Sequence, residues 1–170
     1  MRTIAEVTAQ LRAGPLWSDD VLCSAGGFGF DKLKELLPHR PPFLLLDRVE
    51  QFDSSCKRLW AVKQILESDP NLSPHLSGDS TYPNVLLVEC MGQAAGCLLS
   101  LLGHVGTKSP SIRLARLHHA LFIQPVRPPV DIDIHVALVE SRIRIDRFAG
   151  QIWVGSQLCS LAIGDLHLLR

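Results

Sequence analysis

The longest apolar run of the chain extends from Val85 to Leu102 and is apolar on nearly every side of a helix. It also contains several small residues, namely Gly92, Ala94, Ala95, Gly96 and Ser100. A helix that is apolar on all sides must be buried, because no face of it can be given to water. The run therefore predicts one long buried helix, which Gly103 would end. Glu89 and Gln93, which lie within the run, argue against a membrane span.

After this helix the pattern changes to the alternation that is typical of strands. The segment Val130 to Ile145 alternates most clearly, since the even-numbered positions from 130 to 136 are apolar and the odd-numbered positions between them are polar. Further strands are expected at Ile112 to Val126, Phe148 to Val154 and Leu158 to Leu169. Gly155-Ser156, between the last two, predicts a two-residue hairpin turn.

Two shorter strands are expected before the buried helix, at Phe43 to Phe52 and at Leu59 to Ile65. Residues 66–84 form a long polar segment, and a loop of that length in a compact domain is usually functional. One helix among so many strands must be wrapped by a curved antiparallel sheet, since otherwise it could not be buried. The pattern thus predicts an α+β fold, with a main domain at residues 31–170 and an N-terminal extension at residues 1–30.

The N-terminal extension is expected to contain little regular structure. Apolar residues recur at helical spacing over residues 3–12, which predicts one short helix. Residues 13–30 are rich in Gly and Ser and predict a connecting loop. Asp31 would then cap a second short helix, Lys32 to Leu37.

The composition narrows the class of protein without choosing a function. The chain has 170 residues, of which 46% are hydrophobic and 20% charged, as in ordinary globular domains. Lys plus Arg and Asp plus Glu both number 17, so the zero net charge gives no sign of a nucleic-acid partner and is compatible with an obligate oligomer. The five cysteines contain no CxxC pair, and the N-terminus has no apolar signal-peptide region, so reduced thiols and a cytoplasmic location are expected.

Glu89 is the ionisable residue that stands out, because it lies in the apolar run near the start of the expected helix. A buried carboxylate needs either a partner or a function, and a structural bond to a neighbouring strand and a role as general acid are both open. Gln93 lies on the same helical face and is placed to hydrogen-bond it. His75, in the long loop, is the second candidate, although a lone loop histidine is more often a solvated surface residue.

The other charged and imidazole side chains suggest no catalytic or metal site. Arg142, Arg144 and Arg147 lie near a strand end, where a solvated edge is the ordinary interpretation and a docking face for an acidic partner is the alternative. No metal site is expected, because the remaining histidines lack the spacing of metal ligands. These histidines are His39, His104, His118, His119, His135 and His167.

Several motifs resemble one enzyme family. Residues 36–49, Leu-Leu-Pro-His-Arg-Pro-Pro-Phe-Leu-Leu-Leu-Asp-Arg-Val, closely resemble the opening motif of bacterial 3-hydroxyacyl-[acyl-carrier-protein] dehydratases of fatty-acid synthesis. In that family a Glu that opens Glu-Ala-x-x-Gln follows the catalytic His by fourteen residues, and Glu89 follows His75 by fourteen residues and opens Glu-Cys-Met-Gly-Gln. Phe122 to Val126 resembles a later motif, Phe-Lys-Arg-Pro-Val. The resemblance covers about residues 33–165.

The resemblance implies a hot-dog fold, a homodimer or a trimer of dimers, and dehydration of a (3R)-3-hydroxyacyl thioester to the trans-2-enoyl thioester. The phosphopantetheine of an acyl carrier protein would deliver the substrate, so no metal or dissociable cofactor is implied. His75 would remove the α-proton, and Glu89 of the partner subunit would protonate the departing hydroxyl. Asn84, Gly78 and Gln93 fall at the positions that bind the substrate or hold the oxyanion.

The chain departs from the family motif near both candidate groups. Pro74, Leu76 and Ser77 replace the Gly, Phe and Pro around the histidine, and Asn84 replaces the Gly that supplies the oxyanion N–H. Ile123-Gln124 replaces the basic pair of the later motif. These departures favour a relative from a specialised acyl or polyketide pathway. They also leave two alternatives, a non-catalytic hot-dog subunit that binds acyl chains or partners and a hot-dog thioesterase.

Overall fold

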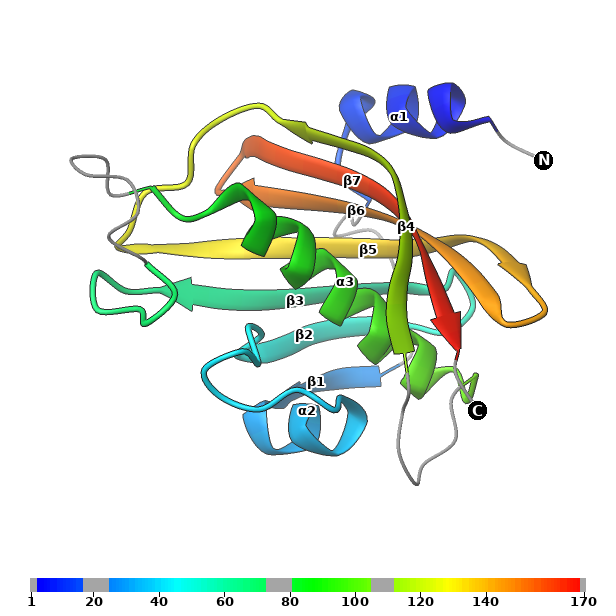
Figure 1. Ribbon diagram of the computed structural model, residues 1–170, viewed down its shortest axis with the longest axis horizontal. Coiled ribbons are helices and arrows are strands. Elements are labelled where there is room, and N and C mark those ends of the chain that lie inside the picture. Colours follow the sequence, from blue (N-terminus) through cyan, green and yellow to red (C-terminus); the bar gives the residue numbers. More distant parts are fainter. Residues whose placement is uncertain (1–2, 17–24, 73–80, 105–111, 169–170) are drawn as a thin grey trace.

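The computed structural model describes residues 3–16, 25–72, 81–104 and 112–168. In this part of the chain, helix α3 (Asn84–Leu101) lies across one face of a seven-stranded sheet (Figure 1). The strands pair antiparallel in the order β1-β2-β3-β5-β6-β7-β4. They are β1 (Ala25–Gly29), β2 (Arg48–Asp53), β3 (Arg58–Ile65), β4 (Ile112–Phe122), β5 (Val130–Arg142), β6 (Ile145–Val154) and β7 (Gln157–Leu168). The expected α+β arrangement is confirmed.

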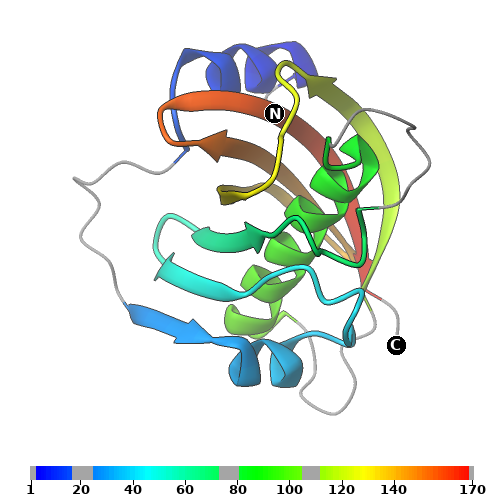
Figure 2. The same cartoon turned by 90° about the vertical axis from the view of Figure 1, so that its left-hand side faces the viewer.

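The sheet curves around α3, which explains how a helix that is apolar on every side can be buried (Figure 2). Leu87, Met91 and Leu98 of α3 are fully buried and belong to the main core, together with inward-facing residues such as Ile134 and Phe148. By length and composition alone α3 could cross a membrane, but most of it is enclosed by the fold. The hairpin expected at residues 155–156 is also present, joining β6 to β7.

Helix α1 (Ile4–Ala13) lies on the outer face of the sheet, away from α3 (Figures 1 and 2). Its Val7 and Leu11 pack in a second, smaller core that also contains Ala149, Leu161 and Ile163. The buried amide of Gln151 fixes the end of this helix by donating to the carbonyls of residues 11 and 14, at 2.6 and 2.8 Å. The N-terminal helix is therefore attached to the outside of β6 and β7.

The glycine-rich segment for which the sequence predicts a loop contains a strand, β1, which pairs with β2 at the edge of the sheet. The glycine content suggests a loop, but one of the three glycines, Gly27, is required sterically by the strand pairing. A Cβ at Gly27 would lie 2.4 Å from the carbonyl oxygen of Val49 and 2.7 Å from that of Glu50. Only glycine lets the backbones of β1 and β2 approach this closely. Glycine usually weakens a strand, but here it permits the pairing.

The short helix α2 (Phe30–Leu36) begins two residues earlier than predicted. Its N-cap is Gly29, which forms no side-chain capping bond, so the expectation that Asp31 caps the helix is wrong. Asp31 instead lies in the first turn, where its carboxylate is 2.7 Å from Nζ of Lys34. A carboxylate at that position is favoured by the helix dipole even without a capping bond.

Three predicted strands are shorter than expected. The strand expected over Val130 to Ile145 ends at Arg142, where a turn at residues 143–144 leads into β6. In the other two, different contacts take over the backbone groups. β2 begins at Arg48 rather than at residue 43, since the preceding segment bonds to a side chain of α3. β4 ends at Phe122 rather than at residue 126. Beyond it, the N–H groups of Ile123 and Gln124 both donate to the carbonyl of Cys159, at 2.8 and 3.1 Å, so the chain turns away from the sheet.

Candidate functional site

Glu89 projects from α3 and keeps 27% of its side chain exposed, although the helix around it is buried. Gln93, one turn later, donates from Nε2 to Oε1 of Glu89 at 2.9 Å. The expected bond between these two residues is confirmed. Among the described residues both partners of Glu89, Gln93 and His39, contact Oε1, and none bonds Oε2.

Gln93 is itself buried and connects α3 to the segment before β2. Its Oε1 accepts from the N–H of Leu45 at 2.9 Å, and its Nε2 also donates to the carbonyl of Phe43 at 2.8 Å. These bonds replace the sheet bonds that residues 43–45 would make as a strand. They hold the opening motif against the helix at the height of Glu89.

His39 also belongs to this site, although the sequence pattern gives it no role there. Its Nε2 lies 3.5 Å from Oε1 of Glu89, and its ring contacts that of Phe43 at a centroid distance of 6.1 Å. Burial lowers the pKa of His39 below its ordinary value, the charge of Glu89 opposes this, and Arg40 reinforces it. His39 and Glu89 are far apart in the sequence, so no local pattern predicts their contact. The only sequence feature that marks His39 is its place in the opening motif.

Asn84 is the first residue of α3 and is exposed at its N-terminus. The N–H groups of Leu86 and Leu87 donate to the carbonyl of Pro83, at 2.9 and 3.4 Å. The N–H groups of residues 84 and 85 precede them and have no acceptor within the helix, so they lie at its open N-terminus. Asn84 is not among the described residues with positive φ. A glycine is therefore not required at this position by the backbone.

A hollow of about 290 Å³ lies at this helix end. The segment before α3 and the residues that follow β4 form its walls, and Tyr82 joins them by donating its N–H to the carbonyl of Val126 at 2.8 Å. The structure thus brings the later motif beside Asn84. The lining residues are Thr81, Tyr82, Pro83, Asn84, Phe122, Ile123, Gln124 and Pro125.

His75 and Gly78 lie outside the described residues, so their place relative to Glu89 stays a prediction. The residues that precede them are firmly attached. Lys63 of β3 forms an ion pair with Asp69 at 2.8 Å, with side chains only 8% and 6% exposed. Asn71 donates to the carbonyl of Pro42 at 3.1 Å. The start of the long loop is therefore tied to both the sheet and the opening motif.

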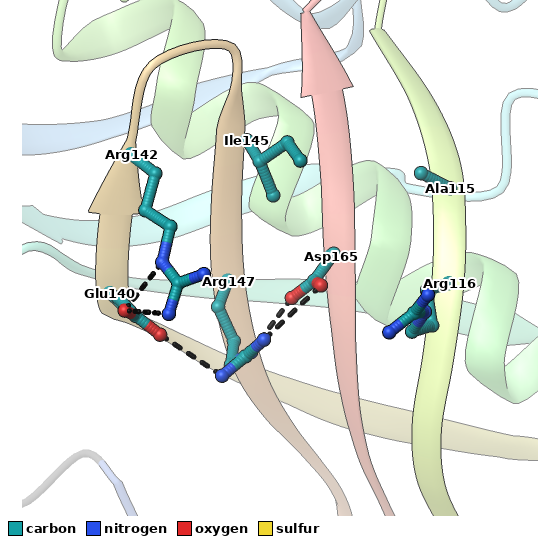
Figure 3. Close-up of a pocket in the computed structure, with 7 residues that line it drawn as sticks. All are labelled: Ala115, Arg116, Glu140, Arg142, Ile145, Arg147 and Asp165. Carbon is teal, nitrogen blue, oxygen red and sulfur yellow. Dashed lines mark hydrogen bonds and ion pairs between the residues drawn. The ribbon is translucent and has the colours of Figure 1, made fainter. Parts of the chain in front are cut away.

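A second hollow, of about 260 Å³, lies on the outer face of the sheet (Figure 3). Arg147 bridges two carboxylates there, donating to Asp165 at 2.7 Å and to Glu140 at 3.0 Å. Glu140 also holds Arg142, and Asp165 also contacts His118, at 2.7 Å in each case. Two of the three arginines that the sequence places at this strand end are thus part of an ion-pair network. Docking of an acidic partner on this face stays a prediction.

The cysteine thiols and the possible metal ligands offer no further reactive site in the described part of the chain. Burial raises the pKa of the Cys97 thiol to about 12 and also raises that of Cys90, so neither thiol is a nucleophile at neutral pH. Within residues 3–16, 25–72, 81–104 and 112–168, no three metal-ligating side chains come together. The chemistry that the described site offers is that of one accessible carboxyl, one imidazole and an open helix end.

A curved antiparallel sheet wrapped around one central helix defines a hot-dog fold. The FabA-like domain family matches residues 37–162. The "3-hydroxyacyl-[acyl-carrier-protein] dehydratase FabZ" of Aeromonas hydrophila is 33% identical over 138 residues, which cover 79% of this chain and 89% of the relative. That of Pectobacterium atrosepticum is 37% identical over 122 residues, covering 71% and 79%. The chain belongs to the FabA-like family.

Solved structures support the fold independently. The dehydratase heterocomplex ApeI:P of Xenorhabdus doucetiae superposes with a TM-score of 0.68 and 18% identity, over 81% of this chain and 91% of that one. A thioesterase superfamily protein superposes with a TM-score of 0.51 and 13% identity, over 72% and 53%. At such identities the likeness shows the shared fold alone, and it confirms the hot-dog fold.

Proposed function

We propose that the protein dehydrates a (3R)-3-hydroxyacyl thioester, carried on the phosphopantetheine of an acyl carrier protein, to the trans-2-enoyl thioester. The observation that carries the proposal is Glu89, an accessible carboxyl on the central helix whose Oε1 is held by Gln93 while Oε2 is left open. Membership of the FabA-like family supports the same reaction. We further propose a cytoplasmic location and a specialised acyl or polyketide pathway.

In the proposed reaction His75 takes the proton from carbon 2 of the substrate. The electrons of that C–H bond form the new double bond while the bond between carbon 3 and its hydroxyl oxygen breaks. Glu89 gives its proton to the departing hydroxyl, which leaves as water. The proton held by His75 then returns to Glu89, so that both groups regain their starting forms and no cofactor is consumed.

The open end of α3 would stabilise the developing negative charge on the thioester oxygen. The N–H of Asn84 and the positive end of the helix dipole are directed toward this end of the helix. The neighbouring hollow, with Phe122 and Pro125 in its wall, would accept the apolar start of the acyl chain. The Asn84 side chain is exposed here and would narrow the approach of the substrate.

A dimer is part of the proposal, because His75 and Glu89 of the partner subunit would form one site. β4 is an edge strand of the sheet, so its outer backbone groups are open to pairing. Three of its large apolar side chains are exposed, Leu114 at 40%, Leu117 at 44% and Phe122 at 40%. Pairing of β4 with a second copy would cover this apolar edge, and a trimer of dimers would extend the assembly.

The test is to incubate the protein with 3-hydroxyacyl carrier protein and to follow the intact mass of the carrier. Loss of the mass of one water, abolished in both His75→Ala and Glu89→Gln, is the expected result. Arg12→Gln, at an exposed position in the last turn of α1, is the control and should keep the activity. Sedimentation of the same samples tests the dimer.

Other outcomes of this experiment would favour the two alternatives. Release of free carrier thiol, in place of water loss, would identify a thioesterase. No change of mass for short, long or aryl-bearing chains, from a well-folded protein, would favour a non-catalytic subunit. In that case Asn84→Gly is the next variant, because it restores the residue of the family motif at the helix end.

A further inference from the structure

Two side chains of the same protomer converge on one oxygen of Glu89. Gln93 Nε2 lies 2.9 Å and His39 Nε2 lies 3.5 Å from Oε1. His39 comes from the opening motif, and Gln93 binds that motif through Phe43 and Leu45. The imidazole and the amide are therefore placed by one common set of contacts.

We propose that His39 is a positioning residue for Glu89, which holds Oε1 together with Gln93 and so turns Oε2 toward the substrate hydroxyl. The inference rests on the proposed dehydration and adds a group to it. His39 belongs to the same protomer as Glu89, whereas His75 would come from the other one. Each site would thus use two histidines, one for proton removal and one for orientation of the acid.

The surroundings of His39 fit this role. Its side chain is 26% exposed, and its Nδ1 is buried without a hydrogen-bond partner in the part of the chain that the structure describes. The charged groups that face the ring are Glu89 of α3 and Arg40 of its own segment. These surroundings are compatible with a neutral imidazole that carries its proton on Nε2. Its Nε2–H then faces Glu89, and no proton is placed on the buried Nδ1.

Arg40 fixes the segment that carries the ring. Its guanidinium donates to the carbonyl of Leu37 at 2.9 Å and to that of His39 at 2.7 Å. The same guanidinium disfavours a second positive charge on the imidazole. Both effects favour a neutral His39 ring held 3.5 Å from Oε1 of Glu89.

The structure offers a matched control for His39. His104, at the other end of α3, has its Nδ1 3.5 Å from a carboxylate oxygen of Asp146 and a side chain that is 29% exposed. The two histidines thus share the distance to a carboxylate and the degree of exposure, but only His39 touches the candidate acid. A substitution that acts through general loss of stability should affect both positions alike.

The first measurement is the titration of the His39 ring, followed by NMR, in the wild type and in Glu89→Gln. Because the charge of Glu89 favours the imidazolium, its removal should move the pKa of His39 further down. An unchanged His39 titration would show that the two groups do not interact and would overturn the proposal. This readout does not depend on activity, so it stands even if the dehydration fails.

The second measurement is the pH profile of dehydration in His39→Phe, His39→Gln and His104→Phe. We expect His39→Phe to lower kcat by about 10- to 100-fold with little change in KM and to change the shape of the pH profile. His39→Gln, whose amide N–H falls near the place of Nε2, should recover much of the loss. Wild-type kcat and an unchanged profile in His39→Phe would contradict the positioning role.

Discussion

Gly150 of β6 lies beneath Met91 of α3 so closely that a Cβ at position 150 would stand 2.8 Å from the Met91 sulfur. The same Cβ would stand 3.0 Å from the Met91 Cβ, so a rotation at the end of the side chain would not remove the clash. The distance between the central helix and the sheet is therefore set by the absence of one methyl group. Because Glu89 is two residues before Met91, this contact also sets the height of the candidate acid.

We expect Gly150→Ala to destabilise the protein by about 1–3 kcal/mol, since overpacking forces the helix or the strand to shift. Met91→Ala alone should cost about 2–5 kcal/mol through the cavity that it leaves. The double variant should lose less than the sum of the two, because the new methyl group fills part of that cavity. Urea denaturation of the four proteins measures this coupling, and strict additivity would show that the contact does not limit the packing of α3.

Gln93→Leu should destabilise the protein by about 2–4 kcal/mol, because it leaves the N–H of Leu45 and the carbonyl of Phe43 without partners. It should also lower dehydration activity, since Glu89 loses its best-placed hydrogen bond. Gln64→Leu, at an exposed position on β3, is the matched control and should change stability by no more than about 0.5 kcal/mol. Equal stability of the two variants would show that Gln93 does not hold the opening motif in place.

Asp69→Ala should destabilise the protein by about 3 kcal/mol, because it leaves the ammonium of Lys63 buried and unpaired. Burial opposes ionisation of Asp69, but the bonds from Lys63 and Asn71 outweigh it and lower its pKa below the ordinary value. A lowered carboxylate pKa stabilises the fold above the unfolded-state value of 3.8, and this contribution is lost as the pH falls through the folded-state value. Thermal unfolding above and below pH 4, with the exposed Glu67→Ala as control, measures both effects.

His135 should make the protein less stable in mild acid. The residue is 9% exposed and packs edge-on against Trp60, and burial lowers its pKa from 6.5 to about 4. Between these two pH values His135 is therefore protonated in the unfolded chain and neutral in the folded chain. Stability should be fully present above pH 6.5 and fall by roughly 3 kcal/mol in total as the pH drops toward 4.

The comparison with His135→Phe isolates this contribution from that of the carboxylates. The variant should lose the part of the pH dependence between 6.5 and 4, while His39, whose pKa is also lowered, still contributes in the same direction. Denaturant midpoints at several pH values give the two curves. Parallel curves for wild type and variant would mean that folding does not lower the pKa of His135.

The sequence by itself determined the class of fold, because the two periodicities are physical requirements of burial. The run at Val85 to Leu102 has no face for water and must be enclosed, and the alternation after residue 130 must form strands with one apolar face. The bond from Gln93 to Glu89 also followed from sequence, since residues four apart on a helix are neighbours. The spacing between His75 and Glu89 carries information only through resemblance to a family.

Tertiary structure alone decided the contacts between residues far apart in the chain. Local pattern treats Gly27 as a loop residue, yet the carbonyls of β2 require a glycine there. It treats His39 as unremarkable, because fifty residues separate it from the carboxylate that it meets across the opening motif. Such contacts depend on how the sheet curves around α3, and that curvature is the sum of all the strand pairings, which no single segment encodes.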